Sequence, residues 1–222
     1  MNIYIGYDPK QSVAYETCVN SIFRNTAHPS FFKAYKLDQN DLRNSKIYWR
    51  EEDDRASTPF SLTRFLVPAL SGYKGWAVYC DCDFLWLDDI SNLFALKDDT
   101  KAVQVVQHVY TPKSASKMDN QINHFYPKKN WSSLMLFNCE HEACRLLTPE
   151  LVNNYDPADL HQFAWCYDGE VGSLPIEWNY LLGYYDKDIK PSAVHFTDGG
   201  PWLEGYENQP YADEWRDYCS QK

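Results

Sequence analysis

Two acidic residues, Asp81 and Asp83, lie one residue apart at the end of the apolar run VYCDCDFLW, residues 78–86. In an extended segment, side chains alternate between two faces, so both carboxylates point the same way. Two carboxylates this close repel each other unless one is protonated or a cation neutralises them, and a divalent cation does so directly. A solvated strand end with helix-capping acids explains the same residues, because short acidic motifs also arise by chance. The local sequence therefore leaves a metal site and a plain strand end open.

A second acidic pair, Asp186 and Asp188, flanks Lys187. It follows aromatic residues and precedes a proline, a composition that is typical of a surface turn. We therefore take the first pair as the candidate site.

The elements that must position the first pair alternate between strands and helices. The run WAVYCD, residues 76–81, is short, apolar and bounded by turn residues, as is typical of a strand buried on both faces of a parallel sheet. Periodicity and turn signals predict further strands over residues 2–8, 102–110 and 131–138, and helices over residues 11–25, 59–70, 140–155 and 157–167. This order predicts an α/β fold with a central, mainly parallel sheet flanked by helices, in a single domain of residues 1–222. Ligands of such sheets bind beyond the carboxyl ends of the strands, where the acidic pair lies.

Composition argues against several classes of protein. Hydrophobic residues make up 44% of the 222 residues and aromatic residues 16%, which is too apolar for a disordered chain. The net charge of −10 argues against nucleic-acid binding, which needs clustered Lys and Arg. No run of about 18 uncharged apolar residues exists, so no membrane span is expected. The start MNIYIGYD is typical of a strand and not of a signal peptide, and seven cysteines without Cys-x-x-Cys spacing favour reduced thiols and a cytoplasmic location.

Four segments, taken in order, carry a resemblance to a known family: IYIGYD (3–8), SLTRFLVPAL (61–70), WAVYCDCDFLWLDDISNLF (76–94) and AVHFTDGGPW (193–202). Their order and spacing resemble those of GT-A fold glycosyltransferases, closest to the retaining family 8 type that includes bacterial lipopolysaccharide galactosyltransferases and glycogenin. The resemblance implies a GT-A-like, Rossmann-like domain. It also implies transfer of a hexose from a nucleotide-diphosphate sugar, with UDP expected as the nucleotide, to an acceptor hydroxyl with retention of anomeric configuration.

The resemblance also implies a metal centre. Asp81 would touch the ribose and the metal, Asp83 would bind the metal more directly, and His195 would be the third protein ligand. Two carboxylates and one imidazole suit Mn²⁺ better than Mg²⁺, because nitrogen donors fit the softer ion, so Mn²⁺, or Mg²⁺ in its place, is the expected cofactor. A histidine after an apolar pair is also typical of a buried core residue, and that reading of His195 is the alternative.

The same resemblance assigns roles around the donor. Gly6, Tyr7 and Asp8 would line the base and ribose pocket. Arg64 would reach the donor sugar or the two aspartates, whereas a plain surface arginine is the alternative. Gln162 would lie near the reacting sugar.

Several residues depart from the family pattern. The late motif usually carries a lysine that binds the diphosphate, but Gly200 stands there, and the backbone amides of Gly199 and Gly200 are expected to take its place because glycine allows close approach to phosphate. The family's Asn-Ala-Gly stretch is replaced by Trp-Ser-Ser at 131–133. Where the family has an acidic residue directly before the glutamine, this sequence has His161.

Two other functions remain open. A non-catalytic protein that binds a nucleotide sugar or carbohydrate would keep the same site residues. A phosphatase of the haloacid-dehalogenase type also uses Asp-x-Asp at a strand end, but its motif belongs to the first strand and continues with Thr or Val where Leu85 stands here. The polar segment 111–129, which carries four lysines, is expected to form a lid that excludes water from the donor, with a plain solvated loop as the alternative.

Overall fold

The computed structural model describes residues 1–51, 58–109, 128–185 and 188–219. Most of the expected lid, residues 111–127, lies outside these ranges, and only its last two residues are described. Asp186 and Lys187 of the second acidic pair lie outside them as well.

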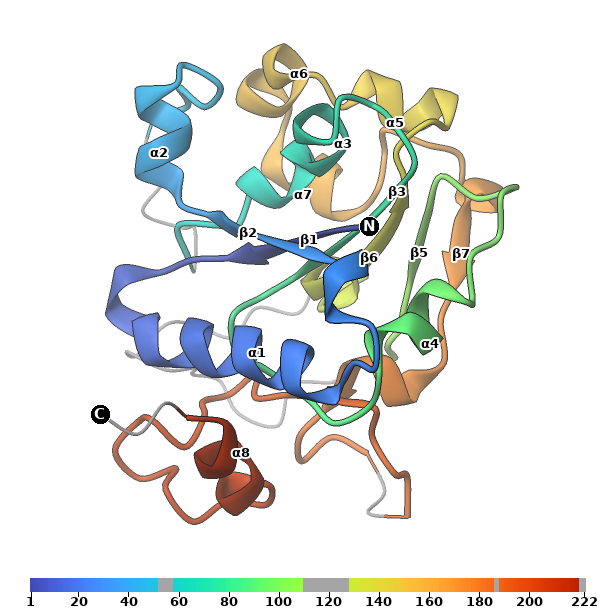
Figure 1. Cartoon of the computed structure of the whole chain (residues 1–222). Coiled ribbons are helices and arrows are strands. Elements are labelled where there is room, and N and C mark those ends of the chain that lie inside the picture. Colours follow the sequence, from blue (N-terminus) through green and yellow to red (C-terminus); the bar gives the residue numbers. More distant parts are fainter. Residues whose placement is uncertain (52–57, 110–127, 186–187, 220–222) are drawn as a thin grey trace.

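A central sheet organises the described residues (Figure 1). Its order is β2 (Lys33–Leu37), β1 (Asn2–Gly6), β3 (Trp76–Cys80), β6 (Leu134–Asn138), β5 (Val103–Val105) and β7 (Val171–Ser173). β6 runs antiparallel to both of its neighbours, and the other neighbouring pairs are parallel. The prediction of an α/β fold with a mainly parallel central sheet is therefore confirmed.

Helices cover both faces of this sheet. The helices are α1 (Ser12–Asn25), α2 (Gln39–Asn44), α3 (Val67–Leu70), α4 (Ile90–Phe94), α5 (Glu142–Leu146), α6 (Pro149–Asn154), α7 (Pro157–His161) and α8 (Ala212–Tyr218). α1 and α4 lie on one face, and α3, α5, α6 and α7 lie on the other (Figure 1). The central strand β6 is buried along its whole length, because both sets of alternating side chains meet a layer of helices.

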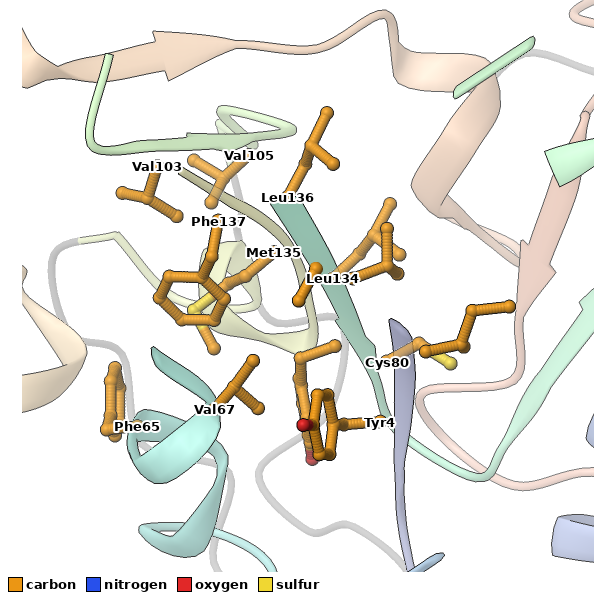
Figure 2. Packing of buried hydrophobic residues seen from close by; sticks show 14 of the residues in the cluster. Tyr4, Phe65, Val67, Cys80, Val103, Val105, Leu134, Met135, Leu136 and Phe137 are labelled. Atoms are coloured by element: carbon orange, nitrogen blue, oxygen red, sulfur yellow. The ribbon is translucent and has the colours of Figure 1, made fainter. Parts of the chain in front are cut away.

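The core shows this two-sided burial directly. Met135 and Phe137 lie on the side of Phe65 and Val67, while Leu136 points to the other side of β6 (Figure 2). Met135, Leu136 and Phe137 are fully buried. Burial of each such side chain contributes about 1.5–3 kcal/mol to the stability of the fold. This packing holds β6 beside β3 and so determines the position of the end of β3.

A second, smaller sheet follows β3. Its order is β4 (Phe84–Trp86), β9 (Ala193–His195) and β8 (Tyr180–Leu181), with β4 and β9 antiparallel. α1 holds the outer edge of β4: the Trp86 amide donates to Ser21 Oγ at 3.1 Å, and Asn25 Nδ2 donates to the Trp86 carbonyl at 2.8 Å. The chain thus passes from one sheet to the other through residues 81–83.

Three of the expected helices have clearly different bounds, and the one expected over residues 157–167 ends at His161. In segment 59–70, residues Thr63–Leu66 form a 3₁₀ helix that continues into the short α3. Pro68 has no amide hydrogen for the carbonyl of Arg64, and that carbonyl accepts from the Val67 amide instead, which tightens the turn. Segment 140–155 divides into α5 and α6, because Pro149 cannot continue α5 and Thr148 caps α6 by accepting from the Leu151 amide.

Neither a membrane-spanning helix nor a disulfide occurs in the described residues. No helix there has the length and apolarity needed to cross a bilayer. The seven cysteines all fall within the described ranges and carry free thiols.

Gly6 ends β1 where space is limited. A Cβ atom there would lie 2.5 Å from Phe60 Cγ and 2.8 Å from Tyr79 Oη. Gly6→Ala is therefore expected to destabilise the protein by about 1–3 kcal/mol through overpacking. Urea unfolding measures the loss, with Gly169→Ala as the control because nothing lies within 4 Å of its Cβ. Equal stability of both variants would contradict the packing role.

Candidate metal centre

Asp81 and Asp83 occupy the link between the two sheets. β3 ends at Cys80 and β4 begins at Phe84, and a backbone hydrogen bond holds each aspartate. The Asp81 amide donates to the Ser133 carbonyl at 3.0 Å, and the Asp83 carbonyl accepts from the Phe196 amide at 3.0 Å. The link is therefore tied to the central sheet at one aspartate and to the end of β9 at the other.

His195 joins the two aspartates through strand pairing. In the antiparallel register of β4 and β9, His195 lies opposite Phe84, and its Nε2 is 3.4 Å from Asp83 Oδ1. One ligand atom from each of Asp81, Asp83 and His195 lies within 4.8 Å of the others. The structure thus brings together the three residues predicted to bind metal, although the sequence separates His195 widely from the other two.

Asn179 sets the orientation of the His195 ring. Its Oδ1 lies 2.9 Å from His195 Nδ1, and its Nδ2 donates to Ser133 Oγ at 2.9 Å and to the Asn130 carbonyl at 3.3 Å. Ser133 Oγ gives its own proton to the Asn130 carbonyl, so it accepts from Asn179. Because Oδ1 can only accept, Nδ1 of His195 carries a proton, and Nε2 is the ring nitrogen that faces the aspartates. Metal-ligating histidines are generally oriented by such a partner.

Arg64 and Tyr79 hold the carboxylate of Asp81. Arg64 Nη2 lies 3.0 Å from Asp81 Oδ1, and Tyr79 Oη donates to the same oxygen at 2.6 Å. Both contacts fall on Oδ1, which leaves Oδ2 for a cation. Burial raises the pKa of Asp81, the Arg64 charge opposes that rise, and the Asp83 charge adds to it.

Arg64 is a buried residue. It is 5% exposed, and its guanidinium also donates to the carbonyls of Ser132 at 2.8 Å and Phe60 at 3.3 Å. The surface-arginine alternative is wrong, because the turn formed by residues 59–66 points the side chain inward under Asp81. Its guanidinium contacts the Asp81 carboxylate and two backbone carbonyls, and it therefore orients that carboxylate.

His161 lies beside Arg64 as a neutral imidazole. Nδ1 is 2.8 Å from Ser132 Oγ, and Nε2 is 3.3 Å from Ser61 Oγ. Burial, and then the charge of Arg64, lower the pKa of His161 to about 3. Gln162 follows at the end of α7, where its carbonyl accepts from Lys128 Nζ at 3.0 Å. No hydrogen bond joins the Gln162 side chain to the three metal-site residues.

The residues expected at the nucleotide lie at the same sheet edge. Gly6 comes one residue after the register pair of Ile5 and Cys80, so it is level with Asp81. Asp8 is buried, and its Oδ1 accepts from the Lys10 amide at 2.9 Å. The ring of Tyr7 has Lys36 Nζ 4.3 Å from its centroid.

The Gly199-Gly200 turn is packed beneath aromatic rings. The Gly199 amide donates to the Phe196 carbonyl at 2.9 Å, so this amide is already engaged. A Cβ atom on Gly200 would lie 1.8 Å from the Trp202 ring. Glycine is therefore required here by the packing of Trp202, and contact with a diphosphate remains a prediction.

Two solved glycosyltransferase structures have a similar fold. The apo structure of the bifunctional glycosyltransferase WbbM superposes on this protein with a TM-score of 0.70 at 16% identity. The superposition covers all of this chain and 50% of the WbbM chain, so this chain spans half the length of WbbM. The galactosyltransferase LgtC, in complex with donor and acceptor sugar analogs, gives a TM-score of 0.63 at 11% identity, over 99% of this chain and 95% of its own. At these identities the likeness establishes the fold, and the protein has the GT-A fold with a three-residue candidate metal centre at its sheet edge.

Sequence comparison identifies a closer relative. No protein-family model matches the chain. Over 218 residues it is 45% identical to Protein CDI of Arabidopsis thaliana. The aligned region covers 96% of this chain and 83% of Protein CDI. The chain belongs to the Protein CDI family.

The sequence alone missed the residues that support the metal ligands. Asn179 and Ser133 have no spacing or composition that distinguishes them from ordinary core residues. The roles of Asn179 and Ser133 depend on contacts between segments that are distant in the chain, so no local signal could have identified them. Tyr79 lies two residues before Asp81, and the alternation of side chains along an extended segment, which places both on one face, is the local signal that was overlooked.

Loss of Asn179 is expected to weaken metal binding. Asn179→Ala frees the His195 ring to rotate and change tautomer, which should lower Mn²⁺ affinity by about 10- to 100-fold. Isothermal titration of the folded variant measures this affinity. Asn138→Ala is the matched control, because Asn138 is also a largely buried amide but lies at the opposite end of β6. Unchanged affinity in Asn179→Ala would contradict the orienting role.

The low pKa of His161 predicts that the folded protein loses stability in acid. Its pKa of about 3 is below the unfolded value of about 6.5, so the unfolded state alone takes up a proton between these pH values. The contribution of His161 to the free energy of unfolding is complete above pH 6.5 and is lost as pH falls towards 3. At pH 5 the loss reaches about 2 kcal/mol. His161→Asn should therefore lose less stability than the wild type between pH 7.5 and 5 in urea unfolding. An identical pH dependence in both proteins, with exposed His28→Asn as control, would argue against a neutral buried imidazole.

Proposed function

We propose that the protein is a metal-dependent glycosyltransferase of the family 8 type. It moves a hexose from a nucleotide-diphosphate sugar, with UDP as the nucleotide, to a hydroxyl of an acceptor, with retention of configuration. The observation that carries the proposal is the position of Asp81, Asp83 and His195 at the carboxyl edge of a GT-A sheet. Ligands of open α/β sheets bind at that edge.

The donor set fits a divalent cation. Asp81 Oδ2, an Asp83 carboxylate oxygen and His195 Nε2 would hold it, and the mixture of oxygen and nitrogen suits Mn²⁺. When bound, such an ion offsets the negative charge that grows on the departing diphosphate. The negative charges of Asp81 and Asp83 favour binding of a cation, since each carboxylate raises the free energy of ionising the other.

The protein's own residues fix the geometry of this site. Arg64 and Tyr79 fix one oxygen of Asp81, and Asn179 fixes the His195 ring. Such preorganised groups favour one arrangement of substrate and leaving group without reorganisation during the reaction.

Retention is proposed to proceed by front-face displacement. Both carboxylates of the metal cluster are assigned to the cation, and the neighbouring His161 is neutral and bonded to two serines. The metal-site carboxylates are therefore engaged with the cation, and His161 offers no carboxylate that could act as a nucleophile. The acceptor oxygen then attacks the anomeric carbon from the side that the diphosphate leaves, and a departing phosphate oxygen takes the acceptor's proton.

Release of nucleoside diphosphate tests the proposal. The purified protein is incubated with UDP-, GDP- and ADP-linked sugars with and without Mn²⁺. We expect metal-stimulated release from one of them, and a loss of at least about 100-fold in Asp83→Asn, as for removal of a metal ligand or major electrostatic group. NMR of the first transferred product should show the anomer of the donor.

Other outcomes would contradict the proposal in different ways. Metal-dependent binding of a nucleotide sugar with no release, in the presence of a sugar acceptor mixture, would favour the non-catalytic alternative. Hydrolysis of phosphomonoesters without any use of nucleotide sugars would favour a phosphatase. An inverted anomer in early product would refute retention alone.

A further inference from the structure

His108 lies at the same sheet edge as the candidate metal centre. It follows β5, which has the same direction as β3 because both run antiparallel to β6. The residues after Val105 and after Cys80 therefore leave the sheet at one edge. The backbone at His108 is held by Trp131, whose Nε1 donates to the His108 carbonyl at 3.0 Å.

One ring nitrogen of His108 is buried and has no hydrogen-bond partner among the described residues. The residue is 6% exposed, its Nδ1 lies 2.5 Å from Tyr185 Oη, and the two rings are stacked with centroids 5.9 Å apart. Nε2 is buried and has no hydrogen bond within the described part of the chain. Buried polar atoms are almost always bonded, so Nε2, on a ring held in place by Tyr185, retains an unused bonding position at this sheet edge.

The surroundings select the chemistry of that ligand. Burial, and to a lesser degree the proximity of His195, lower the pKa of His108 to about 3, so the ring is uncharged at physiological pH. An uncharged ring is a poor partner for a diphosphate. Depending on the proton that it shares with Tyr185, Nε2 is either a donor or an acceptor, and a hydroxyl group can satisfy both states.

We propose that Nε2 of His108 forms a hydrogen bond with a hydroxyl of the sugar in the bound nucleotide sugar. His108 is then a contact that recognises the sugar, and Tyr185 is the residue that positions it. The proposal rests on the proposed function, because it requires a nucleotide sugar at the metal centre. It adds a residue that distinguishes a nucleotide sugar from the free nucleoside diphosphate.

Binding measurements on His108→Ala test this contact. With Mn²⁺ present, the nucleotide sugar that binds the wild type most tightly in the panel and its matching nucleoside diphosphate are titrated separately by calorimetry. Loss of one hydrogen bond should weaken binding of the nucleotide sugar by about tenfold and leave that of the nucleoside diphosphate within about twofold. Tyr185→Phe, which keeps the imidazole but releases its Nδ1, should give a smaller loss with the same selectivity. His28→Ala, an exposed imidazole, should change neither affinity.

The outcomes separate this proposal from the proposed function. If the wild type binds no nucleotide sugar, both are wrong. If the wild type binds one and His108→Ala binds it equally well, or loses both ligands equally, only the sugar contact is wrong. Should His108→Ala not fold, Tyr185→Phe decides alone: a loss limited to the nucleotide sugar supports the contact, and an unchanged ratio of the two affinities refutes it.

Discussion

Repulsion between Asp81 and Asp83 is the constraint on which the rest of the site depends. The pair lies at a buried edge, where like charges interact more strongly than in water. Arg64 offsets the charge of Asp81 from one side, and His195 approaches Asp83 from the other. A buried ion pair adds little net stability by itself, because desolvation costs about as much as the attraction gains. We therefore interpret this arrangement as one that orients the carboxylates.

The passage of the chain between two sheets places those charges. Arg64, Ser132 and Ser133 belong to the surroundings of the central sheet, whereas His195 belongs to the small sheet. Asn179 connects the two groups, since it touches both Ser133 and His195. α1 supports the same junction by satisfying the outer backbone groups of β4, which would otherwise remain unpaired at a sheet edge. The fold thus supplies the relative placement of the sheets, and one buried amide transmits it to the metal ligands.

The sequence predicted best what depends on neighbours along the chain. The strand that ends at Cys80 and the helix that ends at Asn25 were recognisable from their periodicity, and the acidic pair was recognisable from its place after a buried strand. The break before Thr148 was missed, because a cap and a proline outweighed an apolar pattern that continues through it. Asn179 was missed because its role exists only when three distant segments meet. His195 satisfies both interpretations of its sequence: it is 2% exposed and stacks on Phe84 at 4.5 Å, and it also faces the aspartates.

Under the proposed function, the residues that differ from the family 8 pattern change the charge balance of the site. Arg64 is already bonded to Asp81, His161 is neutral, and the Gly200 turn offers a packed backbone where a lysine is usual. Two carboxylates, one guanidinium and a divalent cation leave a net charge of only about +1 for a diphosphate. Under the proposed function, donor binding in this protein therefore depends on the cation more strongly than in a relative that keeps the lysine. The same reduced charge gives neutral contacts a larger share of donor recognition, and the contact proposed for His108 Nε2, which has no hydrogen bond among the described residues, is of that kind.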